Sequence, residues 1–112
     1  MNIESMTVAE LMKFMSVLNL SEKNVTAPWE IGKNYLIRTV TMTNTGRLVA
    51  VTENELVLED AAWVADTGRF SDNVMSCEFS EVEPFPDGRR VIIGRGAVVD
   101  ACVIARLPRH QK

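Results

Sequence analysis

The sequence predicts a mainly β domain, in which one N-terminal α-helix precedes a strongly bent antiparallel small barrel of five short strands. Three observations lead to this prediction. The 112 residues are 46% hydrophobic and 24% charged, which is typical of a single globular domain covering 1–112. A helical period of apolar residues is confined to positions 7–18. Alternating β-branched residues follow from Ile31, and short turn signals between them favour antiparallel neighbours.

The N-terminal helix is predicted over residues 7–18. Thr7 and Glu10 have the spacing of a capping box, in which each side chain bonds the other residue's backbone N–H. Apolar residues then recur on one helical face: Val8, Leu11, Met12, Met15 and Leu18. A linker leads from this helix to Trp29, and core packing is the favoured role of the stripe.

Residues 31–65 predict a meander of three strands. The first strand is expected over Tyr35–Met42, with a turn at Asn44-Thr45-Gly46. The second strand is expected over Arg47–Val51 and the third over Leu56–Val64, separated by a short polar break. Leu56 and Leu58 are expected on one face of the third strand, and Val57 and Glu59 on the other.

The segment 66–88 is predicted to be an irregular insertion before the last hairpin. It contains a turn at Asp66-Thr67-Gly68, a helical turn over Phe70–Ser76, a short strand over Cys77–Val82 and a turn over Pro84–Gly88. The final hairpin is expected over 89–105. Its two strands are Val91–Ile93 and Val98–Ile104, joined by a tight turn at Gly94-Arg95-Gly96. A polar tail is expected over 106–112.

Composition narrows the class of protein. No apolar run approaches the ~18–20 residues of a membrane span, and the first residues lack the basic start of a secretory signal. The cysteines, Cys77 and Cys102, form no metal-binding pair, and His110 is the one histidine. We therefore expect a cytoplasmic protein with reduced thiols, no metal site, no cofactor and no membrane partner.

Charge is unevenly distributed along the chain. Residues 51–87 hold ten acidic side chains against Arg69, whereas 88–112 hold six basic side chains against Asp100. Residues 31–50 are also basic, with Lys33, Arg38 and Arg47. If the fold joins the two basic segments, one face of the molecule is basic and another acidic; otherwise these are separately solvated charges.

Two segments resemble the signatures of the Sm-like (LSm) superfamily. Residues 46–58, GRLVAVTENELVL, contain a glycine, alternating apolar residues, a short polar loop and further apolar residues. Residues 91–99, VIIGRGAVV, contain apolar residues, Arg-Gly and again apolar residues. The resemblance covers about 31–105 and identifies the chain as a divergent member of bacterial or phage type. It implies an SH3-like open barrel with 31–65 as its first motif and 89–105 as its second.

The resemblance also implies assembly, because Sm-like barrels pair their edge strands between subunits to form a ring. The last strand is apolar on both faces apart from Asp100, and such an edge is an aggregation hazard unless it is covered. We expect a cyclic homo-oligomer of about five to seven subunits. Its interface residues are expected to be Val91, Ile93, Val99, Ala101 and Val103.

Single-stranded RNA near the pore is the ligand that the family implies. The matching positions here are Thr52, Glu53, Asn54, Arg95 and Gly96. Gly94 and Gly96 allow positive φ, which would present the Arg95 fork from a tight loop. The alternative for Arg95 is a pair with a nearby acid. Because Glu53, Glu55 and the acidic segment repel phosphate, a ring scaffold that binds protein is the alternative function.

A remote alternative is a dimeric aspartic protease. Asp66-Thr67-Gly68 follows apolar residues, as in the active-site signature of that class, and would supply one carboxylate per subunit to a shared-proton dyad. About 25 residues separate it from Gly94, too few for a flap, and Asp-Thr-Gly is also common in turns. No other catalytic constellation is present in the sequence, so we expect no enzyme and no catalytic residue.

Overall fold

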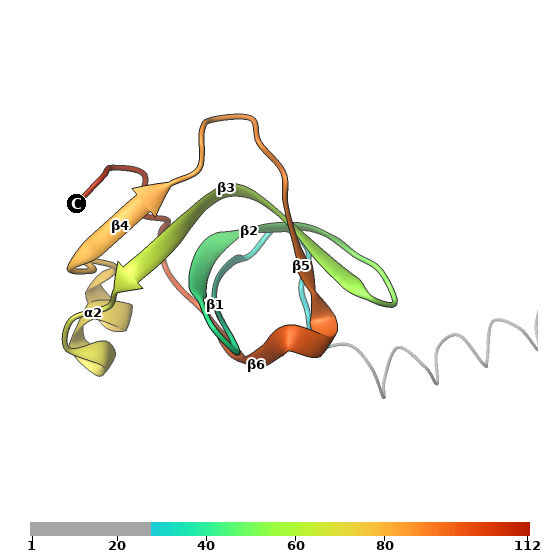
Figure 1. The fold of residues 1–112 in the computed structure, drawn as a ribbon, viewed down its shortest axis with the longest axis horizontal. Helices are drawn as coiled ribbons and strands as arrows, with labels where there is room; N and C mark the ends of the chain where they lie inside the picture. The colour runs from blue at the N-terminus through green and yellow to red at the C-terminus, as the bar shows by residue number, and fades with distance from the viewer. Residues whose placement is uncertain (1–27) are drawn as a thin grey trace, which may run out of the picture.

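A computed structural model describes residues 28–112, and the helix predicted over 7–18 lies outside them. The described chain is mainly β, with one six-stranded antiparallel sheet (Figure 1). The helical elements of this part are α2 (Phe70–Ser76) and the single 3-10 turn η2 (Arg95–Ala97). The strands are β1 (Asn34–Thr39), β2 (Thr43–Val51), β3 (Glu55–Asp66), β4 (Glu81–Pro84), β5 (Val91–Gly94) and β6 (Val98–Val103).

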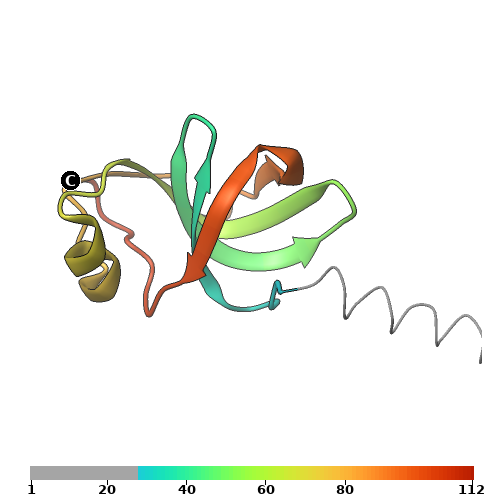
Figure 2. The same cartoon turned by 90° about the horizontal axis from the view of Figure 1, so that it is seen from below.

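The strand order along the sheet is β4-β3-β2-β1-β6, and β5 pairs with the first residues of β3. The 12-residue β3 therefore has two different neighbours on one side, β5 along its first half and β4 along its second half. Figures 1 and 2 show that the sheet is strongly bent, so that β5 and β6 lie on the same side of the molecule. β4 and α2 lie at the C-terminal end of β3. The meander of β1, β2 and β3 is confirmed.

The predicted turn at Asn44-Thr45-Gly46 is wrong, because these residues lie inside β2. The hairpin turns at Val40 and Thr41 instead. The Thr39 N–H donates to the Met42 carbonyl (2.7 Å), and the Met42 N–H donates to Thr39 Oγ1 (3.0 Å). A threonine hydroxyl thus stabilises a turn without the glycine or asparagine that marks most hairpin loops.

Gly46 has a packing role in β2. Asp60 and Ala61 of β3 both lie opposite Gly46, which makes a β-bulge with Asp60 at a φ of 50°. A Cβ on Gly46 would lie 2.8 Å from Leu58 Cβ and 3.3 Å from Ala61 Cβ. Glycine therefore allows the bent strands to approach closely at this point.

Two hydrophobic clusters cover the two faces of the sheet, and β1 alternates between them. Tyr35 and Ile37 of β1 belong to the first cluster, and Leu36 belongs to the second. The rest of the first cluster is Leu48, Leu56, Leu58, Ala61 and Ile93. The rest of the second cluster is Ala62, Val64, Cys77, Phe79, Val82 and Ile104. Leu56 and Leu58 are buried on one face of β3, as predicted.

The insertion 66–88 contains the predicted helical turn, since α2 spans Phe70–Ser76. Cys77, with a φ of 60°, ends this helix in the left-handed conformation. The strand predicted over Cys77–Val82 is displaced toward the C-terminus, to Glu81–Pro84. Phe79 precedes it and is buried in the second cluster, so the apolar residues of this segment fill a core from a loop.

The predicted hairpin over 89–105 is wrong, because its two strands pair with different partners. β5 pairs with β3, β6 pairs with β1, and η2 connects them. Gly94 does not use the positive φ that glycine allows, since its φ is −66°. Gly96 does not have a positive φ either, since the glycines of residues 28–112 with a positive φ are Gly32, Gly68 and Gly88. The 3-10 geometry, closed by the Val98 N–H on the Arg95 carbonyl, replaces the glycine turn.

The expected polar tail packs against β4 and α2. Val82 and Lys112 exchange two backbone hydrogen bonds of 3.1 and 2.9 Å. Leu107 packs on the second cluster. Arg109 donates to the Ala61 carbonyl (2.7 Å), the Phe85 carbonyl (2.9 Å) and Asp87 (2.6 Å). Backbone pairing thus covers part of the outer edge of β4, so this segment completes the fold at that end.

Candidate functional site

The residues predicted to bind RNA come together at one end of the sheet. Arg95 opens η2, and its Nη1 donates to the Thr52 carbonyl at 2.7 Å and to the Glu53 carbonyl at 3.4 Å. The Arg95 backbone N–H donates to the Asn54 carbonyl at 2.8 Å. Gly96 follows within η2. Positions 43 residues apart in sequence therefore form one surface, because β5 pairs with the first half of β3.

Thr52 stabilises the β2–β3 loop from within. Its backbone N–H donates to the Glu55 carbonyl at 2.9 Å, and its hydroxyl accepts from the Glu55 N–H at 2.9 Å. The hydroxyl is therefore engaged in the loop, whereas the side chains of Glu53 and Asn54 face solvent. Glu53 and Asn54 are therefore the residues of this loop whose side chains are free of contacts within it.

The electrostatic character of this surface is mixed. Arg95 contributes one cation, and Glu53 and Glu55 are exposed in the same loop. One nitrogen of the Arg95 guanidinium, Nη1, donates to the loop carbonyls. Phosphate attraction at this point is therefore weak for a single copy, and it would depend on several copies lying close together.

The residues predicted at the subunit interface divide into two groups. Ile93 is only 7% exposed and belongs to the first cluster, and Val91 packs against that cluster. The outward-facing side chain of β5 is Ile92, which is 62% exposed and was missed by the sequence analysis. On β6, Val99 is 67% and Val103 is 53% exposed, while Ala101 is half-buried. Side chains alternate between the two faces of a strand, so the inward-facing Val91 and Ile93 predict that Ile92 faces outward.

The Asp66-Thr67-Gly68 segment forms a turn. Asp66 Oδ1 accepts from the Gly68 N–H at 2.8 Å, and Gly68 has a φ of +74°. Asn73 of α2 donates to the Thr67 carbonyl at 2.6 Å. These contacts form the turn that connects β3 to α2. Asp-Thr-Gly is common in such turns, which is the alternative to a protease signature given above.

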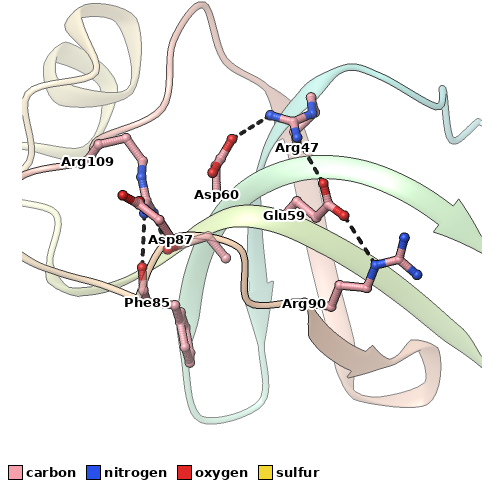
Figure 3. Close-up of polar contacts among 8 residues, drawn as sticks. Arg47, Glu59, Asp60, Phe85, Asp87, Arg90 and Arg109 are labelled. Carbon is pink, nitrogen blue, oxygen red and sulfur yellow. Dashed lines mark hydrogen bonds and ion pairs between the residues drawn. The ribbon is translucent and has the colours of Figure 1, made fainter.

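Five of the nine basic residues in 31–50 and 88–112 pair with acidic residues of 51–87. Figure 3 shows Arg47 bonded to Asp60 (2.7 Å) and to Glu59 (3.1 Å), and Arg90 bonded to Glu59 (3.2 Å). The hydrogen bond with Asp60 raises the pKa of Arg47, and the same bond lowers the pKa of Asp60. Three further pairs join Arg106 and Lys112 to Glu78, and Arg109 to Asp87.

Arg38 connects β1, β6 and α2. Its Nε donates to Asp100 Oδ1 at 2.7 Å, and its Nη2 donates to the second carboxylate oxygen. The guanidinium carbon lies 4.7 Å from the centre of the Phe70 ring, within cation–π range. The hydrogen bond to Asp100 raises the pKa of Arg38 and lowers that of Asp100. This basic residue therefore connects three elements of the fold.

Both cysteines are free thiols, as predicted: Cys77 is buried and Cys102 is exposed. Desolvation raises the pKa of the Cys102 thiol, and the nearby Asp100 carboxylate adds to the shift. Within residues 28–112, no group of three or more His, Cys, Asp and Glu side chains is arranged to hold a metal ion. No helix in the described part of the chain is long and apolar enough to cross a bilayer.

Comparisons of the chain with protein families, with curated proteins and with solved structures gave no significant match. The function is therefore inferred from the geometry of the strand edges and of the loop around Arg95.

Proposed function

We propose that the chain is a subunit of Sm-like architecture that assembles into a closed homo-oligomeric ring and acts as a scaffold. The five strands β6-β1-β2-β3-β5 form a bent antiparallel sheet, which is the arrangement expected for such a barrel. In this proposal, the free edge of β5 in one subunit pairs with the free edge of β6 in the next. Such head-to-tail pairing closes into a ring of about five to seven copies.

The single observation that carries this proposal is the contrast between covered and free strand edges. Within residues 28–112, β5 pairs only with β3 and β6 pairs only with β1. The edge of β4, by comparison, exchanges two backbone hydrogen bonds with Lys112. The fold thus protects one of its edges and leaves two available, and free edges are sites of pairing between chains.

Side chains at the free edges support the same proposal. Ile92 on β5 and Val99 and Val103 on β6 are large apolar groups that face water in the single chain. Pairing of β5 with β6 would satisfy the backbone groups of both edges and place these side chains beside cross-strand neighbours, which cover part of their surface. Desolvation of these side chains would contribute roughly 25 cal/mol per Å² of apolar area.

Light scattering combined with gel filtration tests the proposal. The parent chain should have a mass of about five to seven subunits, and Val103→Asp should lower it toward that of one subunit. Met75→Asp is the matched control, because Met75 is an exposed apolar residue of α2 and belongs to neither free edge strand. A monomeric parent chain, or dissociation by the control alone, would contradict the ring.

Binding of single-stranded RNA is the second candidate function. The observation that favours it is the contact of Arg95 with the Thr52–Asn54 loop, because a ring would bring one such surface per subunit to the pore. Converging arginines can attract phosphate and stack on bases. Fluorescence anisotropy with short U-rich and A-rich oligonucleotides across a salt series tests this function.

Arg95→Ala separates the binding role from the structural one. If Arg95 binds RNA, the ring mass stays unchanged while oligonucleotide affinity falls and its salt dependence flattens. If Arg95 only holds the loop, affinity is unchanged and amide exchange at residues 52–55 accelerates. No binding by the intact parent ring at low salt would leave the protein-binding scaffold as the function.

A further inference from the structure

An apolar groove lies beside the point where the described chain begins. Its volume is about 420 Å³, and its lining includes Pro28, Trp29, Tyr35, Val99 and Val103. The Trp29 and Tyr35 rings meet edge to face, with their centres 5.3 Å apart. Trp29 packs against the first hydrophobic cluster. The groove is therefore an open extension of a core, and water reaches apolar surface there.

The sequence that precedes this groove contains an apolar segment. Eight of the twelve residues in 7–18 are apolar, and the four polar ones recur every third position: Thr7, Glu10, Lys13 and Ser16. In a helix of this sequence the four polar positions would spread over about half of the circumference, because positions three apart differ by about 60°. The other half would carry the apolar face of Val8, Leu11, Met12, Met15 and Leu18. Such a face is stable in water only when another apolar surface covers it.

Chain connectivity brings this segment within reach of the groove. Pro28 lines the groove itself, and nine residues, 19–27, separate it from Leu18. Nine extended residues span about 30 Å, and a twelve-residue helix is about 18 Å long. A short tether of this kind holds its two ends at an effective concentration on the order of millimolar.

We propose that the apolar face of residues 7–18 docks in the Trp29–Val103 groove of its own chain. Docking would cover the side-chain face of β6, which carries Val99 and Val103. It would leave the backbone edge of β6 free, so the docked chain could still pair with a neighbouring subunit. The proposal thus goes beyond ring assembly and does not depend on it.

Engineered disulfides test the position of the segment. In a Cys77→Ala, Cys102→Ser background, Val99→Cys is combined with Met12→Cys or with Met15→Cys. We expect at least one of these pairs to oxidise within one chain, roughly tenfold faster than a control pair with Lys13→Cys at a polar position. Equal rates for all three pairs, or disulfides that form only between chains, would overturn the proposal.

Tryptophan fluorescence provides a second measurement that needs no engineered bond. With Trp63→Phe, Trp29 is the remaining tryptophan. Leu11→Asp with Met15→Asp should shift its emission to longer wavelength, because water would enter the groove. Thr7→Asp with Ser16→Asp adds the same charge at two polar positions and should leave the emission unchanged. If both double variants emit like the parent, the segment does not occupy the groove.

The mass of each sample, measured by light scattering, separates this proposal from the ring. A monomer with the expected disulfide and emission would support docking and reject assembly. A ring whose emission is insensitive to Leu11 and Met15 would support assembly and reject docking.

Discussion

At the scale of single residues, two positions in β2 show how close packing restricts the choice of amino acid. Gly46 lies against the bulge of β3, where an added methyl group would overlap Leu58. Thr45 is fully buried on the other face, and its hydroxyl has no hydrogen-bond partner among residues 28–112. Only glycine fits at position 46. At position 45, burying an unpartnered hydroxyl lowers the stability of the fold, and a methyl group in its place would not.

Gly46→Ala is expected to lower the free energy of unfolding by about 1–3 kcal/mol, as overpacking of a core does. Gly94→Ala is the control, because a Cβ there meets nothing within 4 Å and its φ is −66°. That variant should be neutral or more stable by about 0.4–1 kcal/mol. Urea denaturation of both variants checks the contrast, and equal effects would refute the packing role of Gly46.

Thr45→Val is expected to raise the free energy of unfolding by about 1 kcal/mol, because it removes a buried hydroxyl without a partner and keeps the shape. Thr41→Val, in the exposed β1–β2 turn, should change it by less than about 0.5 kcal/mol. The same urea titrations measure both. A loss of stability in Thr45→Val would mean that the hydroxyl is hydrogen-bonded in solution.

At the scale of elements, arginines hold segments that are distant in sequence. Arg38 links β1 to β6 through Asp100 and to α2 through Phe70. Arg109 links the segment after β6 to β3 and to the β4–β5 connection. The basic residues that sequence alone offers as nucleic-acid contacts thus serve in part as ties between elements.

The Arg38–Asp100 pair predicts a pH dependence of stability. Arg38 lowers the pKa of Asp100 in the folded chain, so the pair stabilises the fold above the unfolded value of about 3.9. This contribution is lost as pH falls through the lowered folded pKa. Asp100→Asn should therefore flatten the decline of unfolding free energy between about pH 5 and pH 2. The pKa of Asp60 is also lowered, so part of the decline in unfolding free energy should remain in Asp100→Asn. If Asp100→Asn and the parent chain decline equally, the Arg38–Asp100 pair does not form in water.

Arg109→Ala is expected to lower the free energy of unfolding by about 2 kcal/mol, mainly through the lost bonds to the Ala61 and Phe85 carbonyls. The exposed Asp87 partner should add little, since surface ion pairs are weak. Arg89→Ala, an exposed neighbour of the same connection, is the control. The backbone amides of Val82 and Lys112 should exchange with solvent faster in Arg109→Ala only. If they exchange at the same rate in both variants, Arg109 does not hold the C-terminal segment against β4.

At the scale of the whole molecule, β1 and β3 belong to both hydrophobic clusters, so neither cluster can form without the same two strands. Leu48→Ala in the first cluster and Leu36→Ala in the second should each cost about 2–5 kcal/mol. Both variants should shift one common transition, because the clusters share their strands. Circular dichroism and tryptophan fluorescence check this, and two separate midpoints would show that the ends of the sheet unfold independently.

Local patterns in the sequence were sufficient to predict the β class, the meander, the faces of Leu56 and Leu58, and the helical turn at Phe70–Ser76. Each of these depends on the pattern of side chains within a few residues. The proximity of Arg95 to the Thr52–Asn54 loop followed from the family resemblance. In the structure it has a local cause, the pairing of β5 with the first half of β3.

Tertiary structure alone decided the features that depend on contacts between distant residues. In sequence, Gly46 is typical of a turn, yet it lies in strand β2, where Leu58 and Ala61 leave no room for a side chain. The segment around Gly94 reads as a hairpin, yet its two strands pair with β3 and β1. Strand pairing and close packing are set by long-range contacts, and a pattern of neighbouring residues carries no information about which distant strand will pair.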